Sequence, residues 1–337
     1  MKKDRGILIW LLSGCLLIFV MVVVGGITRL TGSGLSITEW KVVTGSVPPL
    51  SEAAWQEEFE MYKQIPQYQL LNAHFELSDF KKIYFWEYIH RLIGRMIGVV
   101  FLIPFIYFWM KKRISKELMP RLIIMFLLGG LQGFIGWYMV SSGLSENTRV
   151  SHYRLALHLG TAFFTFGYIF YVYLREAGNR KFEGKATVPL IMTILVFVQI
   201  ILGAFVAGTH AGYVYNTWPD MEGEYIPESF TFALQKDGWS SLFNNLASVQ
   251  FIHRCMAYLV TAGIIYMWWK LKEDRDDVKK RAVNIYIFIV VIQVMLGIYT
   301  LLAHVPVWMG VLHQAMAFVL FATAIVNYYI NSTVKKV

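Results

Sequence analysis

The chain has 337 residues, of which 56% are hydrophobic and only 16% are charged. This composition excludes an ordinary soluble protein and indicates a polytopic membrane protein. The net charge of +9 does not indicate nucleic-acid binding, because lysine and arginine gather in short segments between apolar runs and no basic stripe or base-stacking module is visible. The two cysteines, Cys15 and Cys255, lie inside apolar runs, so we expect neither a disulfide nor a cysteine metal site.

Eight apolar runs are long enough to cross about 30 Å of hydrocarbon as helices. They cover about residues 7–27, 84–109, 121–141, 153–174, 188–207, 249–269, 282–302 and 309–330. The first run has the basic start of a signal peptide, but it is too long and lacks a small-residue cleavage site, so we expect it to remain as a helix. We predict an all-α polytopic membrane protein whose eight transmembrane helices form two pseudo-symmetric four-helix bundles.

Basic residues predict the orientation of these helices. Lysine and arginine precede the first run, fill every second connection and close the chain, all on one side of the predicted membrane. By the positive-inside rule that side is the cytoplasm, so both termini are expected there, in a bacterial cell membrane. The outer side carries two long connections, about 28–83 and 208–248, which are rich in Trp, Pro and Gly. They either cover a site or form an interfacial aromatic belt.

The second half of the chain repeats the first. The matched positions keep their order, and the offset between the halves changes only at the connections. The matches are Gly25 with Gly203, Gly34 with Gly212, His90-Arg91 with His253-Arg254, Gln132 with Gln293, Gly136 with Gly297, Tyr138 with Tyr299, and His158 with His313. Each half holds four helices, which indicates a parallel repeat about an axis near the membrane normal. The predicted domains are residues 1–180 and 181–337.

Four of the eight histidines head every second helix, near its outer end and at nearly one depth. These are His90, His158, His253 and His313. A lone histidine in such a helix is commonly a packing or gating residue, but two per repeat favour a pair of axial haem ligands in each bundle. Zinc, which needs three or four converging ligands, fits this pattern less well. Small residues that follow the histidines leave room for a flat guest, although close helix packing would use the same residues.

One matched position differs in charge. Glu87 and Gln250 each precede the first histidine of their half by three residues. Only a glutamate can exchange a proton, so the half with Glu87 is the better candidate for chemistry and the other half for a permanently bound, electron-carrying haem. Alternatively, Glu87 forms an i,i+4 ion pair with Arg91. Arg91 and Arg254, which adjoin the predicted ligands, are candidates for contacts with haem propionates.

These motifs resemble the haem A synthase family over nearly the whole chain. The match comprises the eight helices, the repeat, the four histidines and Glu87-x-x-His90-Arg91. Two outer stretches, GSGLSITEWK at 32–41 and YNTWPDMEG at 215–223, resemble the mitochondrial and alphaproteobacterial-like subgroup. Some bacterial members carry a cysteine pair in the first outer loop; this chain has none, so no role of that pair applies here.

The resemblance implies an enzyme that oxidises the C8 methyl group of haem O to a formyl group by successive hydroxylations, giving haem A for terminal oxidases. It implies that His90 and His158 face the substrate haem and that Glu87 is essential for the chemistry. It also implies that His253 and His313 are the axial ligands of a haem b cofactor. The implied partners are haem O synthase and terminal oxidase subunits, beside the lipid bilayer.

Two other functions remain open from the residues alone. A di-haem b-type electron-transfer cytochrome that modifies nothing would show the same paired histidines. A transporter of haem or metal is the third possibility, although no relay of ionisable residues is visible in the inner halves of the helices. Small-residue patches also leave a homo-oligomer open.

Overall fold

The computed structural model describes residues 4–40, 44–145, 147–184 and 186–335. Several cations from the predicted topology or the loop motif lie outside the described residues: Lys2, Lys3, Lys41, Lys185 and Lys336. Eight helices of the described part are long and apolar enough to cross a membrane. They are α1 (Arg5–Leu30), α3 (Leu77–Met110), α4 (Met119–Ser141), α5 (His152–Ala177), α6 (Thr187–Thr209), α9 (Leu246–Leu271), α10 (Asp277–Leu302) and α11 (Val307–Asn331). The predicted all-α polytopic fold is confirmed, and every predicted run lies inside one of these helices.

Several helices begin before their apolar run because polar residues cap them. α3 starts at Leu77 because Glu76 and Asp79 form a capping box there. The side chain of Asn245 accepts a hydrogen bond of 3.1 Å from the Ser248 backbone N–H at the start of α9. These caps satisfy backbone donors at the ends of the spans, where the chain leaves the apolar region.

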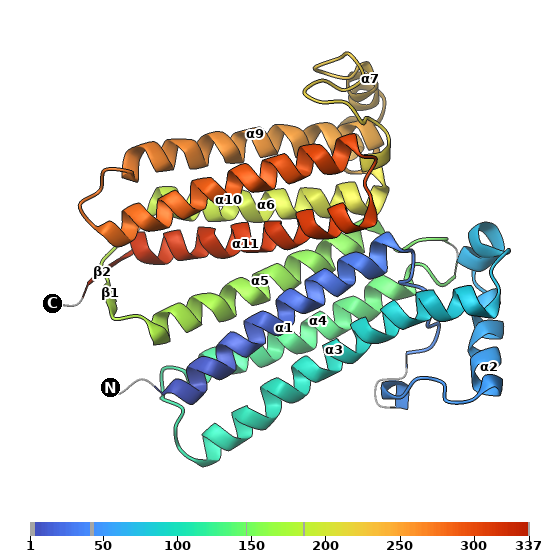
Figure 1. Ribbon diagram of the computed structural model, residues 1–337, viewed down its shortest axis with the longest axis horizontal. Helices are drawn as coiled ribbons and strands as arrows, with labels where there is room; N and C mark the ends of the chain where they lie inside the picture. The colour runs from blue at the N-terminus through green and yellow to red at the C-terminus, as the bar shows by residue number, and fades with distance from the viewer. Residues whose placement is uncertain (1–3, 41–43, 146, 185, 336–337) are drawn as a thin grey trace. The chain divides into compact units, whose positions relative to one another are not determined.

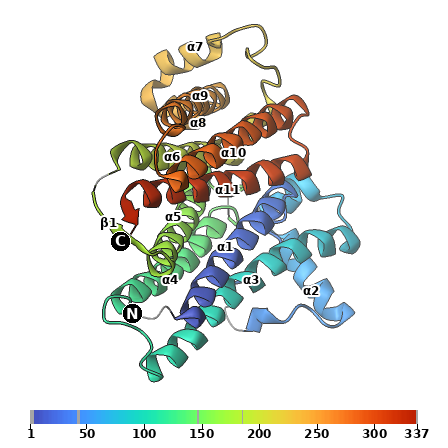
Figure 2. The same ribbon diagram turned by 60° about the vertical axis from the view of Figure 1, so that its left-hand side comes forward.

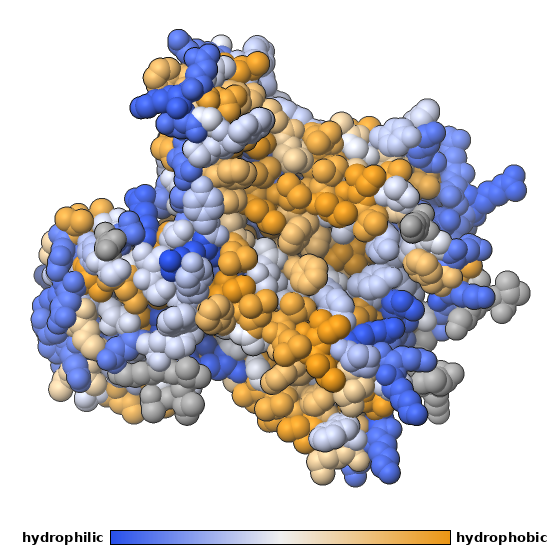
Figure 3. Space-filling view, turned by 180° about the vertical axis from the view of Figure 1, so that it is seen from behind, coloured by the Kyte–Doolittle hydropathy of each residue, from blue (hydrophilic) through white to orange (hydrophobic). Residues whose placement is uncertain are grey.

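Large apolar side chains remain exposed along the spans, among them Ile9, Trp109 and Phe288. On the face shown in Figure 3, hydrophobic residues gather over the middle of the helices and hydrophilic residues gather at the helix ends. Apolar surface of this extent is unfavourable in water but is matched by hydrocarbon in a bilayer. The protein is therefore an integral membrane protein.

By its internal contacts the chain divides into two compact units, Leu16–His158 and Met1–Cys15 with Leu159–Val337. In the second of these units, α6 packs against α9 and α11, and α10 packs against the same two helices (Figure 1 and Figure 2). In the first, α3 packs against α4. The domain boundary between residues 180 and 181 stays a prediction.

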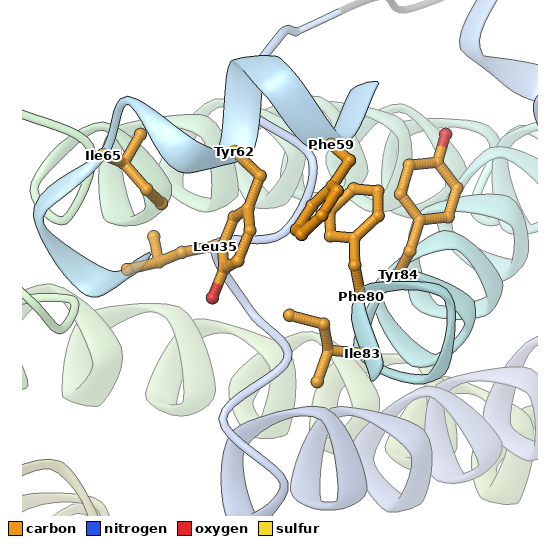
Figure 4. Close-up of a cluster of buried hydrophobic side chains, with 7 residues drawn as sticks. All are labelled: Leu35, Phe59, Tyr62, Ile65, Phe80, Ile83 and Tyr84. Atoms are coloured by element: carbon orange, nitrogen blue, oxygen red, sulfur yellow. The ribbon is translucent and has the colours of Figure 1, made fainter. Parts of the chain in front are cut away.

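The first outer connection is folded and has a core of its own. It contains α2 (Glu52–Lys63) and one turn of π-helix, η2 (Tyr68–Asn72). Phe59 and Tyr62 of α2 point toward Phe80 of α3, with ring centroids 5.1 and 5.2 Å from that of Phe80 (Figure 4). Tyr62 and Phe80 are 0% exposed. The connection is thus a packed cap on the N-terminal end of α3.

The second outer connection contains α7 (Glu228–Asp237) and α8 (Ser241–Asn244), both of which contact α9. Short 3-10 turns complete the outer connections: η1 (Thr44–Ser46), η3 (Ala211–Tyr213) and η4 (Gly238–Ser240).

A two-stranded ribbon lies at the other end of the unit that contains Leu159–Val337. Its strand β1 (Arg180–Phe182) pairs antiparallel with β2 (Thr333–Lys335). The hydropathy of the sequence does not predict this ribbon. Arg180 fastens it, donating to the Thr333 hydroxyl at 3.0 Å and to Asp276 at 2.8 Å.

Candidate functional site

Each of the four predicted ligand histidines lies against a glycine of a neighbouring helix. A Cβ atom built on that glycine would nearly touch the imidazole ring. The closest distances are 3.1 Å from Gly25 to His90, 3.1 Å from Gly136 to His158, 3.2 Å from Gly203 to His253 and 2.9 Å from Gly297 to His313. A larger residue would push the ring away, so the glycines fix where each imidazole lies.

The histidines pair within the two units. His90 and His158 are close enough for their charges to interact, and so are His253 and His313. All four residues are half-buried. Two imidazoles in each unit suit the two axial positions of a haem iron. The described residues hold no group of three or more His, Cys, Asp or Glu that could bind a metal ion.

A glutamine amide adjoins three of the four rings. It stands one turn before the glycine on the same helix. The Nε2 atom lies 3.2 Å from Nδ1 in each case: Gln132 at His158, Gln199 at His253 and Gln293 at His313. The amides of Gln199 and Gln293 also lie 3.4 Å from the ring Nε2 atoms. The described residues provide no hydrogen bond to the fourth ring, His90.

Glu87 is 3% exposed and both of its oxygens are paired. Arg91 donates to Oε1 from Nη2 at 2.7 Å and from Nε at 3.1 Å. The Ser36 hydroxyl and the Ile37 backbone N–H donate to Oε2 at 2.7 and 2.9 Å. Arg91 also donates to the carbonyls of Ile37 and Glu39, at 2.8 and 3.0 Å. The i,i+4 ion pair therefore forms, and together the two side chains tie the start of the first outer loop to α3.

The second half repeats this tie without the carboxylate. Arg254 donates to the carbonyls of Tyr215 and Thr217 at 2.9 and 3.0 Å, which correspond to the two loop carbonyls bound in the first half. Gln250 donates to the Tyr215 carbonyl at 3.0 Å, whereas Glu87 accepts from the loop. The Nε of Arg254 is buried and has no hydrogen-bond partner in the described part of the chain. It is a free cationic donor that suits an anionic group such as a propionate.

Two groups of residues at these sites were not predicted as site residues from the sequence. The glutamines carry a readable signal, since in three helices a glutamine stands four residues before the glycine. Ser36 and Ile37 carry no signal for their contact with Glu87, because that contact depends on how the loop folds. The propionate contact of Arg91 stays a prediction, and Glu87 and the loop already occupy most of the donors of its guanidinium.

The comparisons with known proteins show which family the chain belongs to. A family model described as COX15-CtaA, cytochrome oxidase assembly protein, matches residues 8–325. The chain belongs to this family. A protein named heme A synthase from Flavobacterium psychrophilum is 49% identical over 333 residues, covering 96% of this chain and 97% of the relative. Relatives of the same name from Parvibaculum lavamentivorans and Flavobacterium johnsoniae are each 46% identical, covering 94% and 95% of this chain and 91% and 96% of themselves. The resemblance stated from the motifs is confirmed.

Proposed function

We propose that this protein is a haem A synthase, an oxidoreductase that oxidises the C8 methyl group of haem O to a formyl group by successive hydroxylations. Its product, haem A, serves terminal oxidases. The main support for this proposal is the pair of histidines in each unit, each of whose rings lies against a glycine. The chain's membership of the cytochrome oxidase assembly family also supports it. Two pairs provide two haem positions, one for the substrate and one for a resident cofactor.

The two positions take different roles in this proposal. His253 and His313 would hold haem b, whereas His90 and His158 would face the substrate haem O. Haem b, when bound, supplies an electron carrier to the reaction. The protein's own contribution is to hold both groups in fixed orientations, and the unpaired Nε of Arg254 is suited to a propionate on the haem b side.

Glu87 is the residue that we assign to the chemistry on the substrate side. Its carboxylate can take up a proton at Oε2, where the Ser36 hydroxyl is a hydrogen-bonded neighbour at 2.7 Å. It can also stabilise positive charge that develops on the substrate. Arg91 holds Oε1 in place and keeps one Nη1 N–H beyond its contacts with the loop, which suits a substrate propionate.

A pair of variants separates chemistry from loop anchoring. Glu87→Gln removes the charge and should lower haem A formation by roughly 100-fold or more, the usual range for a lost acid–base group, with haem content retained. Ser36→Ala removes one hydrogen bond to the same carboxylate and leaves the charge, so most activity should remain. If both variants lose activity equally, Glu87 acts as a loop anchor and its chemical role is wrong.

The proposal places the protein in a bacterial cell membrane, with both termini in the cytoplasm and the haem sites toward the outer side. This orientation rests on the distribution of lysine and arginine. Haem O synthase and terminal oxidase subunits would be its partners, since one supplies the substrate and the other receives the product. Labelling of single cysteines placed in the outer and inner connections, in intact cells, tests the orientation.

Haem extraction from the purified membrane protein, followed by chromatography and mass spectrometry, tests the function. The protein is produced with and without a source of haem O. We expect haem b alone without the source, and haem A or its hydroxylated precursor with it. Haem b under both conditions, bound at both sites, would identify an electron-transfer cytochrome instead. Absence of any haem would overturn the histidine-ligand assignment.

A further inference from the structure

A shallow cavity of about 350 Å³ lies at the end of α10 that is opposite to α7 (Figure 1). It is lined by residues of one helix: Asp277, Lys280, Arg281, Asn284, Ile285 and Phe288. Steps of three and four residues place these side chains on one face of α10. The cavity contains none of the residues assigned to the haem sites.

The cavity is charged at one end and apolar at the other. Lys280 and Arg281 lie at the start of α10, and Ile285 and Phe288 follow Arg281 by one and two helical turns. The side chains of Ile285 and Phe288 are 46% and 64% exposed, so the cavity continues into the apolar surface that the span presents to the bilayer. Phe288 lies about 10 Å beyond Arg281 along the helix. Cations followed by exposed apolar surface match a phospholipid, in which acyl chains follow a charged headgroup.

One cation of the cavity is available to a ligand. The Lys280 ammonium lies 3.5 Å from the carboxylate of Asp277, so these two charges partly cancel. Arg281 is exposed and forms no ion pair or hydrogen bond with the described part of the chain. Two cations and one carboxylate leave the cavity with a net positive charge. A guanidinium whose donors are all available suits a phosphate group, which it can bind through two parallel hydrogen bonds.

The neighbouring helix α9 borders the cavity. Trp268 of α9 donates from Nε1 to the Oδ1 atom of Asn284 at 2.9 Å. The Lys272 ammonium lies 5.3 Å from the centroid of the Trp268 ring and 3.9 Å from the Glu273 carboxylate. Tryptophan gathers where the hydrocarbon meets the lipid headgroups. Trp268 therefore marks a depth at which a headgroup is expected, with the cations at the same end of the two helices.

The first half of the chain does not repeat this pair of cations. In the register of the repeat, Met119 of α4 takes the place of Lys280. Pro120 takes the place of Arg281. Lysine and arginine are abundant at this side of the membrane in both halves, so a general excess of cations does not account for a pair that lines a cavity in only one of them.

We propose that this cavity is a binding site for an anionic phospholipid. The phosphate lies at Lys280 and Arg281, and one acyl chain follows Ile285 and Phe288 into the bilayer. The net positive charge favours a headgroup with a net negative charge, as in phosphatidylglycerol, over the neutral headgroup of phosphatidylethanolamine. A lipid held here joins the facing ends of α9 and α10 to the membrane surface.

Lipid titrations of the purified full-length protein test this proposal. Phosphatidylglycerol and phosphatidylethanolamine are added separately, and native mass spectrometry measures the bound lipid. We expect phosphatidylglycerol to bind more tightly, and Arg281→Gln to weaken its binding about fivefold, since a basic residue near an anionic surface contributes about 1 kcal/mol. Lys279→Gln is the matched control. It removes the same charge from a residue of α10 that does not line the cavity, so its affinity should equal that of the parent protein.

Two further arms define the ligand. Asp277→Asn removes the carboxylate that lines the cavity and should strengthen the binding of phosphatidylglycerol. An excess of glycerol 1-phosphate should leave the lipid bound, because it has no acyl chain. Displacement of the lipid by glycerol 1-phosphate would overturn the proposal in favour of a site for soluble phosphate. Equal losses in Arg281→Gln and Lys279→Gln, or equal binding of the two lipids, would show only a general attraction of the membrane surface and would also overturn it.

Discussion

Replacing Gly136 by alanine is expected to weaken haem binding at His158. The added Cβ would lie 3.1 Å from Cε1 and 3.6 Å from Nδ1 of the ring, whereas ordinary contact begins at 3.4 Å. The ring must then retreat by about 0.3 Å in a close-packed interior, which costs roughly 1–3 kcal/mol. The same retreat lengthens the 3.2 Å contact with Gln132. In haem affinity this cost corresponds to a loss of between about fivefold and 150-fold.

Gly133→Ala on the same helix is the matched control. A Cβ at Gly133 meets nothing within 4 Å. Both substitutions add the same atom to α4 and gain the same helix propensity, about 1 kcal/mol in water, so this contribution cancels in the comparison. The assay is haem content per chain and the low-spin absorption spectrum of each purified variant. We expect Gly133→Ala to match the parent protein and Gly136→Ala to lose haem from its site.

Equal haem content in the two α4 variants would refute the steric reasoning. The other glycines extend the test into a series, because their distances to the rings differ. Alanine at Gly297, where Cβ would lie 2.9 Å from His313, should disturb ligation more than alanine at Gly203, where the distance to His253 is 3.2 Å. The reverse order would show that something other than ring displacement controls ligation.

Three further changes test the packing of the first loop and the ion pair that fastens the β1–β2 ribbon. Phe80→Ala should destabilise the cap on α3 by about 3–5 kcal/mol, because Phe80 is fully buried; limited proteolysis of the first outer loop would detect this. Trp40→Ala removes the ring that Arg91 covers at 4.9 Å and should loosen the same loop by only about 0.5–1 kcal/mol. The hydrogen bond from Arg180 lowers the pKa of Asp276 below its ordinary value. Stability from this pair is therefore present above the ordinary carboxyl pKa and is lost as the pH falls through the lowered one. Asp276→Asn should remove that acid dependence from thermal unfolding curves.

Apolar length alone was enough to predict the eight spans, because a bilayer-crossing helix needs a long run of apolar residues whatever its neighbours are. The outer helices could not be predicted in the same way. α2 is amphipathic and mixed in composition, and it buries Phe59 and Tyr62 only because Phe80 is there to receive them. Order in this segment comes from packing between distant residues rather than from hydropathy.

Internal repetition made the four histidines predictable, since a single buried histidine has many explanations and a matched set has few. Their surroundings were only partly predictable. The ion pair of Glu87 with Arg91 follows from helical spacing, whereas the contact of Glu87 with Ser36 depends on a loop that returns over α3. The hydrophobic periodicity of a sequence does not show where a loop folds back onto a helix. The contact between this loop and Glu87 could therefore be seen only in the structure.

Two differences between the halves fall at positions that flank His90 in the repeat. Glu87 of α3 stands where the second half has Gln250. Met21 of α1 stands where the second half has Gln199. The ties of the arginines to the loop carbonyls are the same in both halves. The shared ties thus hold the two loops alike, while Glu87 and Met21 change the charge and the polarity of the surroundings in the first half.

The double variant Glu87→Gln with Met21→Gln should therefore turn the first site into a copy of the second. We expect it to form no haem A, because it lacks the carboxylate. The single variants separate the two contributions: Glu87→Gln should lose the chemistry, whereas Met21→Gln keeps the carboxylate and should retain most activity. If Met21→Gln loses activity as fully as Glu87→Gln, the difference between the halves does not lie in charge alone.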